Sequence, residues 1–142
     1  MILHVEDEAP IRLICRFHLE LAGMEVIEAA DGRTGLERAR RDLPDLVLLG
    51  VMMPGLDGWR VAERLVEDPA THEIPIVFLT TRSELRDRAT GLEIGAVDYL
   101  TMPFDPLELP GLIREVLERV DRGEREQLRR ERLAELRGVL GE

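Results

Sequence analysis

Five short apolar runs alternate with amphipathic stretches along the first 120 residues of this 142-residue chain. The runs are rich in Leu, Ile and Val and lack a regular polar alternation, which is typical of strands buried on both faces. They cover residues 2–5, 24–27, 46–49, 76–79 and 97–100. This pattern predicts an α/β fold, a doubly wound five-stranded parallel sheet flanked by five helices.

The first amphipathic stretch begins near Pro10, which suits the first turn of a helix, and ends at Gly23. The others lie near residues 33–41, 59–66, 83–94 and 109–120. Spacing in the first stretch predicts an inner stripe made of Ile11, Ile14, Cys15, His18 and Ala22.

The fifth stretch carries a proline at an awkward place. Asp105 is a good N-cap and Pro106 suits a first turn, so Pro110 falls on the fifth helical residue. A proline there removes a backbone hydrogen bond. We therefore expect a kink or a restart at Pro110.

Residues 121–142 form a second, charged segment that we separate from the domain at 1–120. They carry six Arg and six acidic residues, and we expect one further helix. Two interpretations stay open. The segment is either a solvated extension of the fifth helix or a helix that docks on a partner or on a second copy.

The net charge of −10 lies entirely within residues 1–120. It disfavours nucleic acids and anionic membrane surfaces as partners, because both require positive charge on the protein. A single cysteine, Cys15, forms no internal disulfide, and we find neither a signal peptide nor a transmembrane stretch. We expect a cytoplasmic location.

Right-handed crossovers place all strand-to-helix loops of a parallel sheet at one edge, where ligands bind in folds of this class. Polar and small residues follow four of the predicted strands at that edge. They are Glu6, Asp7, Glu8, Gly50, Thr80, Thr81 and the segment 101–103.

Six motifs occur in order at residues 5–8, 44–49, 51–58, 74–80, 95–100 and 102–104. Through these motifs the chain resembles the receiver domain of two-component response regulators over residues 1–120. The resemblance implies a flavodoxin-like sheet in the order 2-1-3-4-5. It also implies phosphoryl transfer from a histidine kinase to an aspartate at the end of the third strand, assisted by Mg²⁺.

Part of the implied reaction centre is intact. Glu6 and Asp7 match the acidic pair that holds Mg²⁺, and Met52 matches the position whose backbone carbonyl completes that site. Thr80 matches the hydroxyl residue that contacts the phosphoryl group. Together with Tyr99, Thr80 also forms the switch pair of the family.

Two positions depart from the family. Gly50 replaces the phosphoacceptor aspartate, and Met102 replaces the lysine before Pro103. The chain has no lysine at all, since its 19 basic residues are all Arg. A glycine has no nucleophile and a thioether is only a weak acceptor. Asp57 does not substitute as acceptor, because we expect it to cap the next helix.

These departures predict a degenerate receiver, or pseudo-receiver, that is not an enzyme. We expect no cofactor beyond weakly bound Mg²⁺. We also expect Arg82 or another nearby arginine to offset part of the negative charge of the acidic patch. As in the family, the bond between Met102 and Pro103 is expected to be cis, while His4 and Cys15 are expected to be packing residues.

We therefore expect a stand-alone module that binds a protein. The partner is a histidine kinase, another regulator or an effector, bound through the face of the fourth helix, fifth strand and fifth helix or through the C-terminal helix. The sequence leaves open whether the chain forms a homodimer. The alternatives are an active phosphorelay receiver with an unusual acceptor and a small-ligand sensor that uses the altered pocket.

Overall fold

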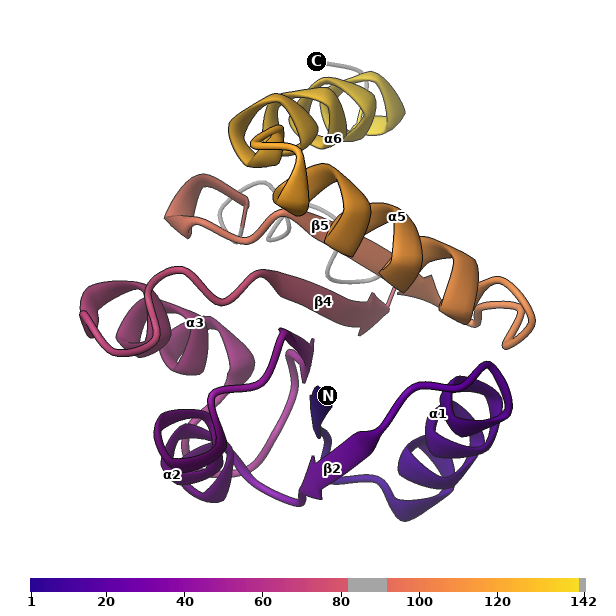
Figure 1. Cartoon of the computed structure of the whole chain (residues 1–142), viewed down its shortest axis with the longest axis vertical. Coiled ribbons are helices and arrows are strands. Elements are labelled where there is room, and N and C mark those ends of the chain that lie inside the picture. Colours follow the sequence, from indigo (N-terminus) through magenta and orange to yellow (C-terminus); the bar gives the residue numbers. More distant parts are fainter. Residues whose placement is uncertain (82–91, 141–142) are drawn as a thin grey trace.

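The computed structural model describes residues 1–81 and 92–140 of the chain. Its five parallel strands form a single sheet in the order β2-β1-β3-β4-β5, as predicted (Figure 1). The strands are β1 Ile2–Val5, β2 Val26–Ala29, β3 Leu46–Gly50, β4 Ile76–Thr81 and β5 Asp98–Met102. β1 and β3 are buried throughout, which accounts for their continuous apolar sequences.

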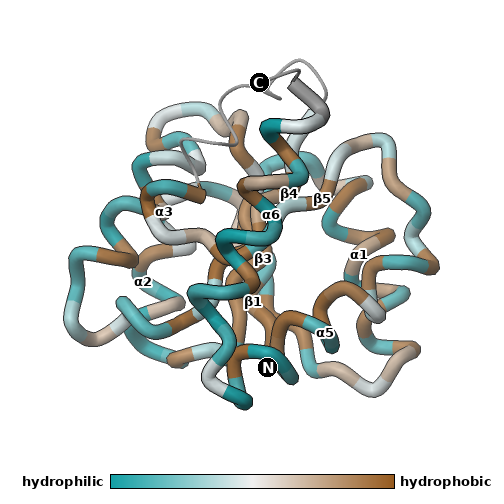
Figure 2. Tube along the Cα trace, turned by 90° about the horizontal axis from the view of Figure 1, so that it is seen from above, coloured by the Kyte–Doolittle hydropathy of each residue, from teal (hydrophilic) through white to brown (hydrophobic). Residues whose placement is uncertain are grey.

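Helices cover both faces of the sheet (Figure 2). One face packs against α1 Ala9–Leu21 and α5 Leu109–Asp121, and the other packs against α2 Gly32–Asp42 and α3 Gly58–Glu67. Two apolar layers result, one around Val47 and Phe78 and the other around Leu48 and Ile113. Apart from residues 92–94, which are helical, the helix predicted near 83–94 lies outside the described residues.

The second strand begins two residues later than predicted, at Val26 instead of residue 24. Gly23 adopts a left-handed φ of 87°, and the Met24 N–H donates to the carbonyl of Leu19 at 3.0 Å. This turn closes α1, so Met24 belongs to the helix end and not to the strand.

The inner side of α1 differs from the predicted stripe. Cys15 and Leu19 are fully buried, and Ile11 packs beside them. Ile14 is 40% exposed and His18 is only half-buried. Helix periodicity defines a stripe but leaves its rotation open when apolar residues lie on both sides, as they do in α1.

Pro110 does not kink α5, because the helix begins at Leu109 and Pro110 stands in its first turn. A separate turn precedes the helix. Within it, Asp105 Oδ1 accepts from the Leu107 N–H at 3.0 Å, and its carbonyl accepts from the Glu108 N–H at 2.9 Å. The restart alternative is therefore correct, and Pro110 costs no helical hydrogen bond there.

The C-terminal segment forms a separate helix, α6 Arg125–Leu140, after a turn at Gly123 with φ 76°. It folds back onto its own chain and contacts α5 and β5 (Figure 1). Leu128, Leu133 and Leu136 are buried there. The segment is thus not a solvated extension of α5. It covers the edge strand of the sheet, whose backbone groups would otherwise be open to pairing.

Candidate functional site

The carboxyl edge of the sheet brings most of the predicted site residues together. Gly50 lies opposite Leu79 of β4, and Met102 lies opposite Thr81 at the ends of β4 and β5. A cavity of about 130 Å³ opens between these strand ends. It is lined by Glu6, Glu8, Ile11, Val51, Met52, Leu79, Thr80, Thr81 and Met102. Gly50 itself does not line it, and neither do Asp7 and Tyr99.

Gly50 and Glu6 share one space. A Cβ atom on Gly50 would lie 2.8 Å from Glu6 Oε1 and 3.3 Å from Glu6 Cδ. The Glu6 carboxyl group therefore lies too close for a side chain at position 50 to begin there without a shift. Any larger residue at position 50 requires Glu6 to move.

The glycine at position 58 allows a close backbone approach within the β3–α3 connection. A Cβ there would lie 2.2 Å from the Gly50 carbonyl oxygen, which no real side chain tolerates. The Gly58 N–H instead donates to the carbonyl of Val51 at 2.8 Å. Asp57 caps the following helix as predicted, accepting from the Arg60 N–H at 3.0 Å.

Glu6 is 5% exposed. Burial raises its pKa from 4.5 to about 7, although a hydrogen bond from the Glu8 N–H at 3.2 Å opposes the shift. The neighbouring Asp7 also raises this pKa. Near neutral pH the group is thus divided between its neutral and charged forms.

A nearby arginine does reach this part of the chain. Arg12 Nη1 donates to the backbone carbonyl of Glu6 at 2.7 Å, while its Nε lies 3.9 Å from Glu28. The residue was not singled out from the sequence, because its position in α1 shows no motif. Arg82 lies outside the described residues.

Thr80 and Tyr99 lie on neighbouring strands. Thr80 is buried and faces Thr101 in the register, whereas Tyr99 faces Phe78. Since alternate residues of a strand share a face, both side chains project from the same side of the sheet, in a diagonal relation. Tyr99 is half-buried and packs on the apolar layer that contains Phe78.

Met102 supplies an apolar, half-buried side chain that packs on the α1 and α5 side of the core and also borders the cavity. Its bond to Pro103 is cis, as predicted. A thioether brings no positive charge to the cavity.

The donor set fits Mg²⁺ poorly. Within residues 1–81 and 92–140, no three His, Cys, Asp or Glu side chains are grouped so that they could share a metal ion. Mg²⁺ requires near-octahedral oxygen ligands. Glu6 and Glu8 line the cavity whereas Asp7 does not, and Glu6 is only partly ionised near neutral pH.

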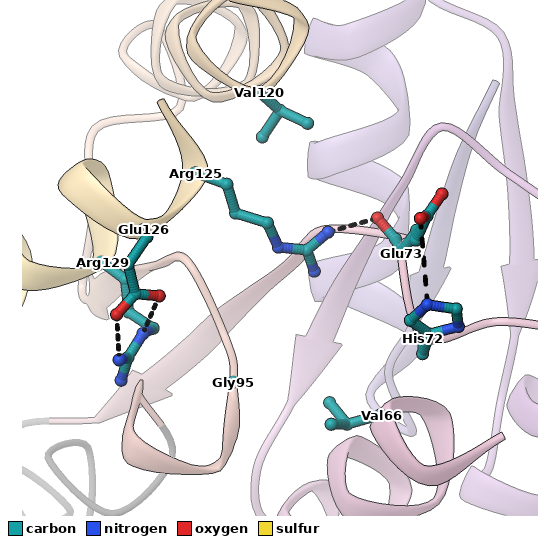
Figure 3. Close-up of a pocket in the computed structure, with 8 residues that line it drawn as sticks. All are labelled: Val66, His72, Glu73, Gly95, Val120, Arg125, Glu126 and Arg129. Carbon is teal, nitrogen blue, oxygen red and sulfur yellow. Dashed lines mark hydrogen bonds and ion pairs between the residues drawn. The ribbon is translucent and has the colours of Figure 1, made fainter. Parts of the chain in front are cut away.

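A larger cavity, of about 550 Å³, lies where the start of α6 meets the α3–β4 connection and the turn at Gly95 (Figure 3). Arg125 donates to the carbonyls of Glu73 and Ile74, and Arg129 pairs with Glu126 while donating to the Leu92 carbonyl at 2.9 Å. Both guanidinium groups thus fasten α6 to the domain.

In the part of the chain that the structure describes, every helix is too short or too polar to span a lipid bilayer.

Comparisons with known sequences agree with this geometry. Residues 2–114 match the family model described as response regulator receiver domain. The chain is 44% identical over 119 residues to the phosphate regulon transcriptional regulatory protein PhoB of Escherichia coli, a match that covers 84% of this chain and 52% of PhoB. It is 47% identical over 121 residues to "Probable transcriptional regulator ycf27" of Porphyridium aerugineum, covering 85% and 49%. The chain spans about half the length of these relatives.

Solved structures agree as well. The chemotaxis protein CheY4 of Vibrio cholerae superposes with a TM-score of 0.76 at 31% identity, covering 81% of this chain and 96% of CheY4. The receiver domain of NtrX from Brucella abortus gives a TM-score of 0.78 at 27% identity, covering 83% and 98%. With the sheet order and the matched residues, these findings show that the chain belongs to the response regulator receiver domain family.

Proposed function

We propose that this chain is a degenerate receiver that takes part in two-component signalling by binding a protein, without phosphorylation of an aspartate. The observation that carries the proposal is the relation between Gly50 and Glu6. The residue at the end of β3 has no nucleophile, and the Glu6 carboxyl group lies 2.8 Å from the point where its Cβ would stand. Met102, which lines the same cavity, brings no positive charge to it. Positioned charge supplies most of the rate in phosphoryl transfer, so we propose binding and not catalysis.

The partner we propose is a histidine kinase, another regulator or an effector. Because α6 packs on α5 and β5, a protein that approaches this side of the domain meets α6 first. Its outward residues include Arg130 and Glu131, so this surface offers charges of both signs. A cytoplasmic location belongs to the same proposal, and the single buried thiol of Cys15 supports it.

Nucleic-acid binding is not part of the proposal. The two relatives are named as transcriptional regulators, but this chain matches only about half of each. Its net charge of −10 opposes contact with phosphates.

Incubation with acetyl phosphate and Mg²⁺, followed by intact-mass measurement, tests the proposal. We expect no phosphoryl adduct on the chain. The double variant Gly50→Asp/Met102→Lys is the matched control, because it restores both reacting groups on the same scaffold, and it should gain the adduct. An adduct on an aspartate of the unaltered chain would support the alternative of an active phosphorelay receiver with an unusual acceptor.

The remaining alternative is a small-ligand sensor. The cavity beside Thr80 and Met102 measures about 130 Å³, whereas sites for drug-sized ligands usually measure about 300–1,000 Å³. It would accept only a very small molecule. A thermal-shift screen with small metabolites distinguishes this alternative, since a ligand that raises the melting temperature of the unaltered chain but not of a Thr80→Val variant would support it.

A further inference from the structure

The cavity of about 550 Å³ beside the start of α6 lies at the opposite edge of the sheet from Gly50 (Figure 3). The connections that form it lead into the amino ends of β4 and β5, whereas Gly50 ends β3 at the carboxyl edge. Its volume falls within the range of about 300–1,000 Å³ that is usual for small-molecule sites. Neither the predicted site residues nor the proposed function involves this edge of the sheet.

Arg125 brings a positive charge to this cavity without a close counter-ion. Its guanidinium group donates to the backbone carbonyls of Glu73 and Ile74, to the second at 3.4 Å. It forms no ion pair within residues 1–81 and 92–140. Burial lowers its pKa, although the more distant charges of Glu73 and Glu126 oppose the shift. Two of its five N–H groups are used in this way, so three remain for a ligand.

The other charged side chains of the cavity are engaged with each other or point to solvent. Arg129 Nε donates to Glu126 Oε2 at 3.0 Å, and Arg129 Nη2 donates to the second oxygen of the same carboxylate. The Glu73 side chain is 88% exposed, with one oxygen 3.8 Å from His72 Nε2. Arg125 is therefore the group of this cavity that is best placed to bind an anion. Because α6 begins at Arg125, the positive end of the helix dipole adds to this preference.

The cavity also has an apolar part. Val66, near the end of α3, and Val120, near the end of α5, are both half-buried and line it. Figure 3 shows the two side chains on either side of the Arg125 side chain. A charged group between aliphatic walls fits a ligand that has a charged head and an apolar body.

We propose that this cavity binds a small aliphatic molecule with a carboxylate group, which Arg125 holds between α6 and the α3–β4 connection. The planar guanidinium group matches the two oxygens of a carboxylate, and the aliphatic body contacts Val66 and Val120. A phosphate dianion fits less well, because Glu73 and Glu126 also line the cavity and repel a second negative charge. The inference is independent of the proposed function, since it uses none of the residues on which that function depends.

Calorimetric titration of the 142-residue chain with 4-methylpentanoate tests the proposal, and the neutral 4-methylpentanamide is the matched control ligand. We expect the carboxylate to bind about tenfold more tightly than the amide, because the hydrogen bonds from Arg125 are strongest to an ionised acceptor. Absence of binding would overturn the inference, as would equal affinity for the two ligands. Tighter binding of inorganic phosphate than of 4-methylpentanoate would also overturn it.

Leucine distinguishes two sources of this chemistry, because it has the same aliphatic body and adds an ammonium group for which Glu73 offers a carboxylate. Tighter binding of leucine identifies the ligand class as amino acids. Tighter binding of 4-methylpentanoate identifies it as carboxylic acids without an amine. Either result supports the proposal.

A pair of variants tests the role of Arg125. Arg125→Gln should weaken the binding of 4-methylpentanoate by about tenfold or more. Arg137→Gln is the matched control, since Arg137 is another arginine of α6 and does not line the cavity, and it should bind as the unaltered chain does. Circular dichroism checks that both variants fold, because Arg125 also fastens α6. Unchanged affinity in a folded Arg125→Gln would overturn the inference.

Nuclear magnetic resonance of the unaltered chain locates the site without any substitution. Titration with 4-methylpentanoate should shift the backbone amide signals of Val66, Gly95 and Val120, which line the cavity. The signals of Gly50 and Thr80, at the carboxyl edge of the sheet, should stay in place. Shifts confined to the carboxyl edge would overturn the inference.

Discussion

The Glu6 carboxyl oxygen lies 2.8 Å from the point where a Cβ atom of residue 50 would stand, so Glu6 and Gly50 depend on each other. With glycine at position 50 the Glu6 carboxyl group keeps its place, whereas a Cβ there would require it to shift. A side chain at position 50 and the present position of the Glu6 carboxyl group therefore exclude each other.

A double-mutant cycle measures this dependence. Gly50→Ala should be more favourable by about 1 kcal/mol in a Glu6→Ala background than in the unaltered chain, because the added methyl group no longer displaces the carboxyl group. Urea unfolding of the four proteins gives the coupling energy. A coupling near zero would mean that Glu6 moves aside without cost.

Magnesium binding should depend on position 50. Calorimetric titration of the unaltered chain should detect weak Mg²⁺ binding at most, since Glu6 is partly protonated and no three His, Cys, Asp or Glu side chains of the described residues are grouped so that they could share a metal ion. Gly50→Asp adds a carboxylate beside Glu6 and should tighten binding and raise the melting temperature with Mg²⁺. Equal titration curves for the two proteins would contradict the poor fit of the present donor set.

The raised pKa of Glu6 should make the free energy of unfolding fall as the pH rises. The unfolded chain loses this proton near pH 4.5, whereas the folded chain keeps it to about pH 7. The contribution of Glu6 to the free energy of unfolding is therefore complete below pH 4.5. It declines as the pH rises to about 7, by no more than about 3 kcal/mol. Glu6→Gln should remove this decline in denaturant midpoints measured across pH 4.5–7. A decline of the same size in that variant would assign it to another group.

The titration of His4 should lower the free energy of unfolding as the pH falls, opposite to the effect of Glu6. Burial, with a smaller effect of the Arg12 charge, lowers its pKa from 6.5 to about 4, and neither ring nitrogen has a hydrogen-bond partner among the described residues. Below pH 6.5 the unfolded chain takes up a proton that the folded chain refuses, so stability falls between pH 6.5 and 4 by up to about 3 kcal/mol. His4→Leu should remove this loss in unfolding experiments, while a variant of the exposed His72, His72→Gln, should retain it.

The ion pair between Arg132 and Asp98 should contribute to the attachment of α6. Arg132 Nε lies 3.0 Å from Asp98 Oδ1, and Asp98 is 2% exposed, with its pKa raised by burial despite the arginine. Arg132→Leu leaves a buried carboxylate unpaired and should cost about 3 kcal/mol in urea unfolding. Arg130→Leu, on the exposed side of α6, should cost less than about 0.5 kcal/mol. Equal losses of stability in the two variants would indicate that the buried Leu128, Leu133 and Leu136 alone hold α6 on the domain.

The sequence by itself determined the alternation of strands and helices, because buried parallel strands and amphipathic helices differ in the period of their apolar residues. It also placed Gly50 and Met102 in recognisable motifs, at the positions where the resemblance implies the acceptor aspartate and the lysine. The cap at Asp57 follows from local chemistry in the same way.

Only the tertiary structure decided which side of α1 faces the core, because apolar residues lie on both sides and the rotation depends on packing against distant elements. It alone turned Glu6 into the space beside Gly50 and folded α6 back so that Arg132 meets Asp98. These relations join residues 34 or more positions apart, and local periodicity holds no information about such distances.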